Sequence, residues 1–165
     1  MQELKHICRN FGPVFDENSK ILILGSFPSV KSRQSAFFYG HPQNRFWPLL
    51  SKIFEEEIPP DINNKTKFCL THRIALWDVL EECDIIGSSD SSIRNAVPVD
   101  INKILSAADI QAIFCNGATS HKLYDKYLRH ISGLEAVRLP STSPANAACS
   151  MDILYSQWIA IKKFF

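Results

Sequence analysis

The residues whose side chains could bind a ligand or take part in a reaction are most concentrated in two neighbouring stretches, GSFPS at 25–29 and SAFFYGHPQNRFW at 35–47. A loop of about twenty residues thus separates a predicted strand from a predicted helix, and loops of that length in compact domains usually have a function. The rings of Phe37, Phe38 and Tyr39 stand where a loop is normally polar. They either anchor the loop on the core or form a stacking surface for a flat ligand such as a nucleobase.

Asn44 and His41 are the polar side chains of this segment that allow two interpretations each. Asn44 directly precedes an apolar-periodic stretch that begins at Phe46, and asparagine is a favoured helix N-cap. His41 precedes Pro42 and suits either a catalytic base or a turn residue. Position alone does not decide between a structural and a chemical role at either residue.

Two further segments place hydroxyl groups directly after predicted strands. LPSTSP at 139–144 offers three hydroxyl side chains, and NGATS at 116–120 joins a glycine turn to the start of a helix. Ser, Thr and backbone amides often contact phosphates in protein–DNA interfaces, and helix N-termini attract anions. An ordinary Ser/Pro turn and a plain N-cap at Thr119 or Ser120 explain the same patterns.

Several other chemistries lack their motifs. The sequence has no GxSxG, Walker loop or HExxH, and 25–29 is not GxGxxG. The five cysteines form no CxxC pair, and the CxxH of Cys69 and His72 has no second pair nearby. We therefore expect ordinary reduced thiols in a reducing compartment.

Four short apolar runs predict the strands that position these segments: 21–24, 74–77, 112–115 and 134–139. Apolar residues recur at helical spacing between and after them, at 46–54, 99–105, 123–128 and 153–161. This alternation predicts an α/β sandwich with a mostly parallel sheet. Right-handed crossovers would gather the carboxyl ends of the strands at one edge, where open α/β sheets carry their sites. Residues 87–92 are predicted to form a polar loop that could be mobile.

The length and the net charge of the chain limit the kinds of partner that it can bind. The 165 residues predict one domain, and 18 Lys+Arg against 17 Asp+Glu give a net charge of +1, which excludes a polybasic binder. A nucleic acid would therefore be contacted through a local patch. The N-terminus has no secretion-signal pattern and no run reaches the roughly 18 apolar residues of a membrane span, so we expect a cytoplasmic protein without membrane contacts.

The ordered motifs GSFPS, YGHPQNRFW, FCNGATS and LPSTSPANA resemble the uracil-DNA glycosylase superfamily, and within it the hypoxanthine-DNA (deoxyinosine) glycosylase branch. They touch the strand ends and cover essentially the whole chain. The resemblance implies a three-layer α/β/α sandwich around a central four-stranded, mostly parallel sheet, formed by residues 1–165 as a single DNA glycosylase domain.

Two departures separate the chain from better-known branches. The mismatch-specific branch has its catalytic asparagine at the third residue of the first motif, a position held here by Phe27. The uracil-specific branch has a histidine before the Pro-Ser of the last motif, where this chain has Leu139. The hypoxanthine branch resembles the chain at both positions, and its catalytic role belongs to the asparagine of HPQNRFW, which corresponds to Asn44.

The resemblance implies a monofunctional enzyme that turns a deaminated base, hypoxanthine above all, out of double-stranded DNA and hydrolyses its glycosidic bond. Asn44 would orient the water. The implied base-binding residues are Ser26, Phe27, Phe38, Tyr39 and Trp77. The implied DNA-backbone and wedge residues are Ser29, Thr119, Ser141, Thr142 and Ser143.

Such a reaction requires no metal and no cofactor, and we expect the protein to act as a monomer. Two alternatives stay open at this point. One is a mismatch-specific uracil/thymine-DNA glycosylase, and the other is a non-catalytic protein of the same fold that binds damaged DNA or a nucleotide.

Overall fold

The computed structural model describes residues 3–164. Its centre is a sheet of four parallel strands in the order β3 (Ile74–Asp78), β2 (Ile21–Gly25), β6 (Ala112–Asn116) and β7 (Ala136–Leu139). All four predicted strands are confirmed, with β7 starting at Ala136 instead of Leu134. The registers pair Gly25 with Asp78 and Asn116 with Leu139, so the carboxyl ends meet at one edge.

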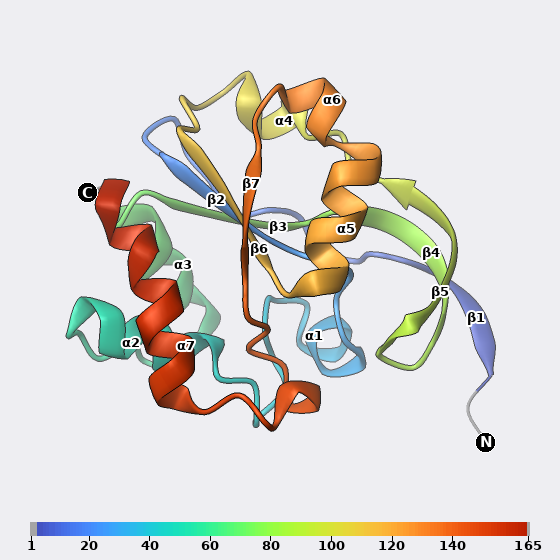
Figure 1. The fold of residues 1–165 in the computed structure, drawn as a ribbon, viewed down its shortest axis with the longest axis horizontal. Helices are drawn as coiled ribbons and strands as arrows, with labels where there is room; N and C mark the ends of the chain where they lie inside the picture. The colour runs from blue at the N-terminus through green and yellow to red at the C-terminus, as the bar shows by residue number, and fades with distance from the viewer. Residues whose placement is uncertain (1–2, 165) are drawn as a thin grey trace.

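Helices cover both faces of this sheet (Figure 1). On one side lie α2 (Phe46–Phe54), α3 (Ile62–Thr71) and α7 (Met151–Trp158), and on the other lies α5 (Ala118–Tyr127). Strands β2 and β3 are buried along their whole length, because helices cover both faces of the sheet at its centre. The predicted three-layer α/β/α sandwich is therefore confirmed.

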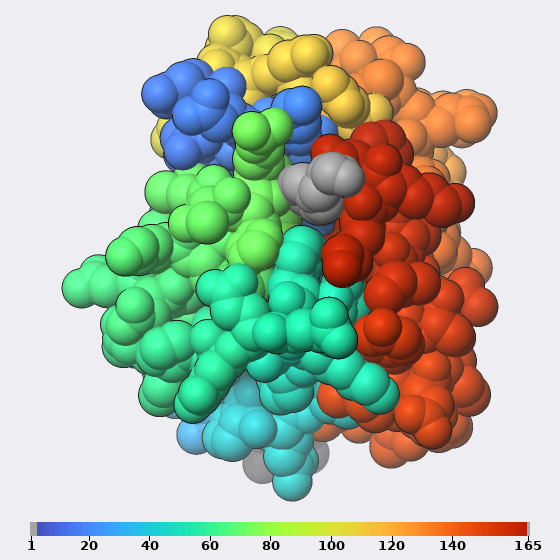
Figure 2. Space-filling model, turned by 90° about the vertical axis from the view of Figure 1, so that its left-hand side faces the viewer, coloured from blue at the N-terminus to red at the C-terminus, as the bar shows by residue number. Residues whose placement is uncertain are grey.

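The remaining helices are short and lie in the connections. They are α1 (Val30–Ser35), α4 (Asn102–Leu105), α6 (Arg129–Ser132) and the 3₁₀ segments η1 (Pro144–Asn146) and η2 (Ile159–Phe164). Figure 2 shows that the segment around α2 and α3 lies beside the segment around α7 on the surface of the molecule, in agreement with the packing of α2 on α7. The amphipathic stretches predicted at 46–54 and 153–161 therefore cover the same face.

A second sheet was not predicted from the sequence. It is antiparallel, with the order β1 (Leu4–Cys8), β4 (Leu80–Ile86) and β5 (Ser89–Pro98), and lies on the same side as α5 (Figure 1). Its strands alternate or are largely exposed, so they lack the apolar runs that mark buried strands. The prediction of a polar loop at 87–92 was wrong, because these residues form the turn and the start of β5.

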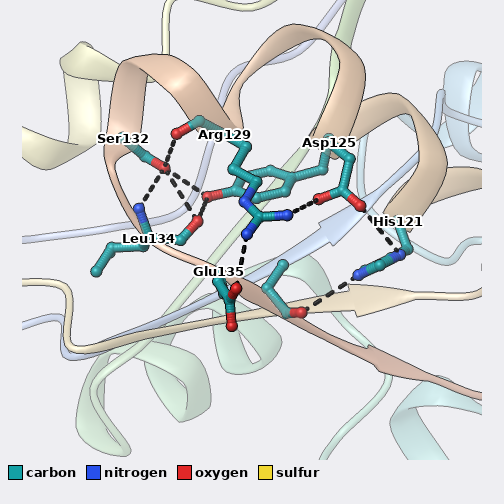
Figure 3. A network of polar contacts seen from close by, with 8 residues as sticks. His121, Asp125, Arg129, Ser132, Leu134 and Glu135 are labelled. Carbon is teal, nitrogen blue, oxygen red and sulfur yellow. Dashed lines mark hydrogen bonds and ion pairs between the residues drawn. The ribbon is translucent and has the colours of Figure 1, made fainter.

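A polar network joins α5 and α6 to the start of β7 (Figure 3). The Tyr124 hydroxyl donates to the carbonyl of Leu134 over 2.6 Å and contacts Ser132 Oγ at 2.5 Å. Arg129 donates to the Glu135 carboxylate over 2.6 Å. These contacts fix the crossover that aligns β7, whose far end carries the segment LPSTSP.

Among the helices formed by residues 3–164, none combines the length and apolar character needed to cross a membrane.

Candidate active site

A cavity of about 120 Å³ lies at the carboxyl edge of the central sheet. Its wall brings together residues 25–29, Phe38, Tyr39, Asn44 and 141–143, and it also includes Phe11, Ser32, Asp78, Ile85, Ser88, Asp90 and Asn116. Cavities of roughly this size bind small planar molecules. The edge predicted from the strand order thus carries a pocket on the scale of one base.

The GSFPS loop is held against the sheet by its own backbone. The carbonyls of Gly25 and Ser26 accept hydrogen bonds from the amides of Val79 and Leu80 at 2.9 and 3.1 Å. A Cβ at Gly25 would lie 2.4 Å from Asp78 Oδ1, so only glycine allows this close approach. No hydrogen bond recorded for residues 3–164 outside the helices and strands uses the Phe27 N–H, which leaves it available at the cavity wall.

Asn44 lines the cavity and also bonds to the start of helix α2. Its Oδ1 accepts from the Phe46 N–H at 2.9 Å, at the first residue of α2, and from the Thr142 hydroxyl at 2.9 Å. Because a carbonyl oxygen has two lone pairs, these bonds occupy it. The backbone donor fixes the orientation of the amide, so the group that Asn44 can offer to the cavity is its Nδ2 donor.

Thr142 and Asn116 complete this arrangement. The Asn116 Nδ2 donates to Thr142 Oγ1 at 3.0 Å, and the Thr142 N–H donates to Asn116 Oδ1 at 3.0 Å. The Thr142 side chain is fully buried. The structure therefore places Thr142 as a support for Asn44 and not at the surface, where the predicted contact with the DNA backbone would require it.

Arg45 joins the second and last motifs. Its guanidinium donates to the carbonyls of Asn146 and Cys149, and its N–H donates to the Thr142 carbonyl at 3.1 Å. Residues far apart in the chain are thereby held on one side of the cavity. At Gly117, φ is +101° and an ideal Cβ would lie 3.1 Å from Ser141 Cβ, so glycine suits both the backbone conformation and the close packing of the Ser141 segment.

The aromatic rings divide between core and cavity. Phe37 and Phe38 are buried and pack edge to face. Tyr39 stacks on Phe46 with ring centroids 3.9 Å apart, while it also lines the cavity. Tyr39 has φ +55°, and a non-glycine residue with such a backbone is frequently found at functional sites.

The hydroxyl of Tyr39 has no hydrogen-bond partner although it is buried. Such an atom costs free energy unless a ligand or water satisfies it. Burial and, after it, the nearby Asp78 carboxylate raise the pKa of Tyr39, while the neighbouring Asn116 side chain lowers it. The phenol therefore stays protonated and can donate a hydrogen bond.

Two carboxylates line the cavity that the sequence analysis did not select as site residues. Asp90 Oδ1 accepts from Ser26 Oγ at 2.8 Å, and burial raises the pKa of Asp90 against the opposing effect of this bond. Asp78 forms a buried ion pair with Arg9 at 3.1 Å. Burial raises the pKa of Asp78 while Arg9 lowers it.

The sequence gives a reason to expect Asp78 at the site but none to expect Asp90 there. Asp78 follows the apolar run of β3 directly, so its place at the carboxyl edge could be expected. Asp90 belongs to the hairpin of the second sheet, which the Ser88 side chain joins to the first loop by accepting from the Val30 N–H at 2.9 Å. No local pattern marks that tertiary contact.

The other predicted site residues are distributed as follows. Ser29, Ser141 and Ser143 line the cavity. Thr119 lies outside it, in a neighbouring groove that also contains Arg138, Ser141 and Ser143. Trp77 is 4% exposed and is not part of the cavity wall, because β3 turns its indole into the core, so the structure does not bring it together with the proposed base-binding residues.

The structure shows which local contacts His41, Thr119 and Ser120 make. His41 Nδ1 accepts from the Gln43 N–H at 3.1 Å, as in a turn. The N-cap of α5 is Gly117, so neither Thr119 nor Ser120 caps that helix, and Ser120 Oγ donates to the Leu24 carbonyl at 2.7 Å. The five cysteines are free thiols.

The fold and the cavity define the class of the protein. The sequence profile of the Uracil DNA glycosylase superfamily matches residues 13–159. The chain belongs to this superfamily, and DNA glycosylase activity is the function that this membership supports.

Individual relatives are similar over nearly their whole length. A Methanosarcina acetivorans protein named hypoxanthine DNA glycosylase is 35% identical over 156 residues, which are 94% of this chain and 98% of the relative. A Methanosarcina barkeri protein of the same name is 36% identical over 84% of this chain and 87% of its own. A solution NMR structure of a Methanosarcina acetivorans protein described as a uracil DNA glycosylase superimposes with a TM-score of 0.79 at 35% identity, covering 93% of this chain and 94% of the other.

Proposed function

We propose that this chain excises hypoxanthine from double-stranded DNA by hydrolysis of the N-glycosidic bond, leaving an abasic site. The observation that carries the proposal is the one-base cavity at the carboxyl edge of the sheet, with the Asn44 amide fixed in its wall. The names of the two Methanosarcina relatives support hypoxanthine as the substrate. Residues 1–165 would act as one glycosylase domain, as a cytoplasmic monomer.

The base would enter the cavity after it leaves the DNA stack. Tyr39, backed by Phe46 on one side of its ring, would stack on the base, with Phe38 and Phe27 completing an apolar wall. The Phe27 N–H and the unpaired Tyr39 hydroxyl would donate to polar atoms of the purine. These donors would also stabilise the negative charge that develops on the departing base.

Asn44 and Asp90 would act together on the water. Because the Asn44 oxygen is occupied, its Nδ2 would donate to the water oxygen and hold it near C1′ of the sugar. Cleavage of the glycosidic bond would lead and an oxocarbenium-like sugar would form, as in other glycoside hydrolyses. The Asp90 carboxylate would stabilise that positive charge and take the proton of the attacking water.

The groove beside the cavity would contact the DNA backbone. Thr119, Ser141 and Ser143 offer hydroxyls there, and Arg138 adds an exposed cation. Phosphate contacts of this kind position a duplex without reading its sequence. Ser29 lies at the cavity and would contact the nucleotide itself.

A panel of duplexes, each with one hypoxanthine, uracil, thymine mismatch or xanthine, tests the proposal through release of the free base. We expect hypoxanthine to be released fastest. Faster release from G:U or G:T pairs would support a mismatch-specific glycosylase instead. Binding of the lesion duplex without release of any base would identify a non-catalytic binding protein.

A further inference from the structure

A second cluster of chemically active side chains lies on the outer face of the antiparallel sheet, away from the cavity. The register of β1 and β4 pairs Cys8 with Glu82 and His6 with Asp84. Alternate residues of a strand share a face, so all four side chains stand on one face. The neighbouring residues Cys83 and Ile85 point the other way, into the core.

The potential ligand atoms of this cluster lie close together. His6 Nε2 lies 3.3 Å from Glu82 Oε1, and Cys8 Sγ lies 3.6 Å from Glu82 Oε2. The potential ligand atoms of His6, Cys8 and Glu82 all lie within 4.8 Å of one another. The two contacts use different oxygens of the Glu82 carboxylate, so a small movement of the side chains would be needed to bring one oxygen, the nitrogen and the sulfur around a single Zn²⁺ ion at its usual bond lengths of about 2.0–2.3 Å.

A second set of contacts orients the histidine. His6 Nδ1 lies 2.7 Å from Asp84 Oδ1, and Asp84 Oδ2 accepts from Asn95 Nδ2 at 2.7 Å. Metal-binding histidines usually donate their other ring N–H to a carboxylate, which fixes the tautomer and leaves the remaining nitrogen for the metal. Asn95 has φ +51° in an irregular part of β5, a backbone conformation that asparagine adopts more readily than most residues.

We propose that His6, Cys8 and Glu82 bind a Zn²⁺ ion, with Asp84 and Asn95 orienting His6 and with water as the fourth ligand. A mixed set of imidazole, thiolate and carboxylate favours Zn²⁺ over Mg²⁺ or Ca²⁺, which prefer oxygen ligands alone. The bound ion would join the exposed strand β1 to β4.

A Zn²⁺ ion bound between β1 and β4 would also affect the position of Arg9, which contacts a residue of the cavity wall. Arg9 follows Cys8 directly and forms the buried ion pair with Asp78. An ion that holds the end of β1 would hold Arg9 in place. The proposal is independent of the glycosylase reaction, because no ligand belongs to the cavity wall.

Metal binding by the full-length protein tests the proposal. Zn²⁺ affinity is measured by competition with a chromophoric chelator, and Co²⁺ is used as a probe for thiolate-to-metal absorption in the near ultraviolet. We expect one Zn²⁺ per chain with a Kd of about 1 μM or tighter, a thiolate–Co²⁺ band, and a higher Tm with Zn²⁺.

Matched variants identify the ligands. Cys8→Ser and His6→Gln should weaken Zn²⁺ binding by at least about 100-fold, and Asp84→Asn by about 10-fold or more. Cys149→Ser removes the other partly exposed thiol and should leave binding unchanged. Wild-type protein that does not bind Zn²⁺ at 100-fold molar excess, or Cys8→Ser that binds as wild type does, would show that the cluster is only a set of ion pairs.

Discussion

At the scale of single residues, the Asn44 amide illustrates how a helix start becomes part of a site. Its oxygen satisfies the Phe46 N–H at the beginning of α2 and receives the Thr142 hydroxyl. Arg45, and not Asn44, is the N-cap of α2, but the Asn44 oxygen still satisfies the first N–H of the helix. A role at the helix start and a catalytic role are therefore compatible, because they use different atoms of the Asn44 amide. The structural bonds orient the nitrogen that the proposed reaction needs.

The Tyr39 hydroxyl separates a structural from a functional role. Since it is buried without a partner, its removal in Tyr39→Phe should leave the free energy of unfolding unchanged or slightly increased. If the hydroxyl donates to the base, single-turnover excision should fall by about 5- to 20-fold, corresponding to one hydrogen bond. Denaturant unfolding and excision are measured on the same preparation. Unchanged excision by Tyr39→Phe would remove the hydroxyl from the mechanism.

Because Asp90 is proposed as the base, we expect the rate of excision to depend on pH. Burial raises the pKa of Asp90, so wild-type excision should decline toward acid pH at a higher pH than an ordinary carboxyl would cause. Asp90→Asn should lower excision about 100-fold, on the scale of a general base, and should abolish this acid limb. The raised pKa means that the charged form destabilises the fold as pH rises, so Asp90→Asn should be at least as stable as wild type at neutral pH. An unchanged acid limb in this variant would contradict the assignment.

At the scale of secondary-structure elements, the residue that follows β1 supplies half of a buried ion pair. The side chains of Arg9 and Asp78 are 3% and 6% exposed. Arg9→Leu would leave the Asp78 charge without its partner and should destabilise the protein by about 3–5 kcal/mol. The double variant with Asp78→Asn should recover part of that loss. Urea unfolding measures both, and a loss below about 1 kcal/mol in Arg9→Leu would show that β1 contributes little.

The elements differ in how far the sequence predicts them. Runs such as Ile21–Leu24 are apolar throughout because both faces of their sheet are covered, and this makes them recognisable. The segment Ser89–Pro98 is polar and mostly exposed, so its pairing with β4 depends on tertiary contacts that no periodicity reveals. For the same reason Asn44 and Tyr39 could be selected from their motifs, whereas Asp90 could not.

Side-chain direction was the other property that motifs did not predict. Thr142 and Ser143 are adjacent in one segment, yet Thr142 is fully buried and Ser143 remains partly exposed. Trp77 stands one residue before the carboxyl edge and faces the core. For Trp77, position near a strand end brings the residue close to the site, but the alternation of the strand turns its side chain away from it. For Thr142, which follows β7, the side chain reaches the cavity wall but is bonded to Asn44 and Asn116 and does not face solvent.

At the scale of the whole molecule, the net charge of +1 predicts a weak dependence of DNA binding on salt. The groove beside the cavity offers Arg138 and several hydroxyls, so few counterions should be released. The slope of log K against log salt concentration should lie between about −1 and −3, corresponding to roughly one to three neutralised phosphates. Fluorescence anisotropy with a lesion duplex measures it. A slope near −6 or steeper would indicate an extended basic surface that this account does not include.

The central claim is that the cavity at the carboxyl edge, with Asn44 in its wall, cleaves the glycosidic bond. The most direct test is single-turnover release of hypoxanthine from a duplex by wild type, Asn44→Ala and a control variant, Gln43→Ala. Gln43 precedes Asn44 in the chain and is exposed. We predict that Asn44→Ala slows release by about 100-fold or more, while it still binds the lesion duplex and Gln43→Ala retains the wild-type rate. Release at the wild-type rate by a folded Asn44→Ala protein would contradict the account.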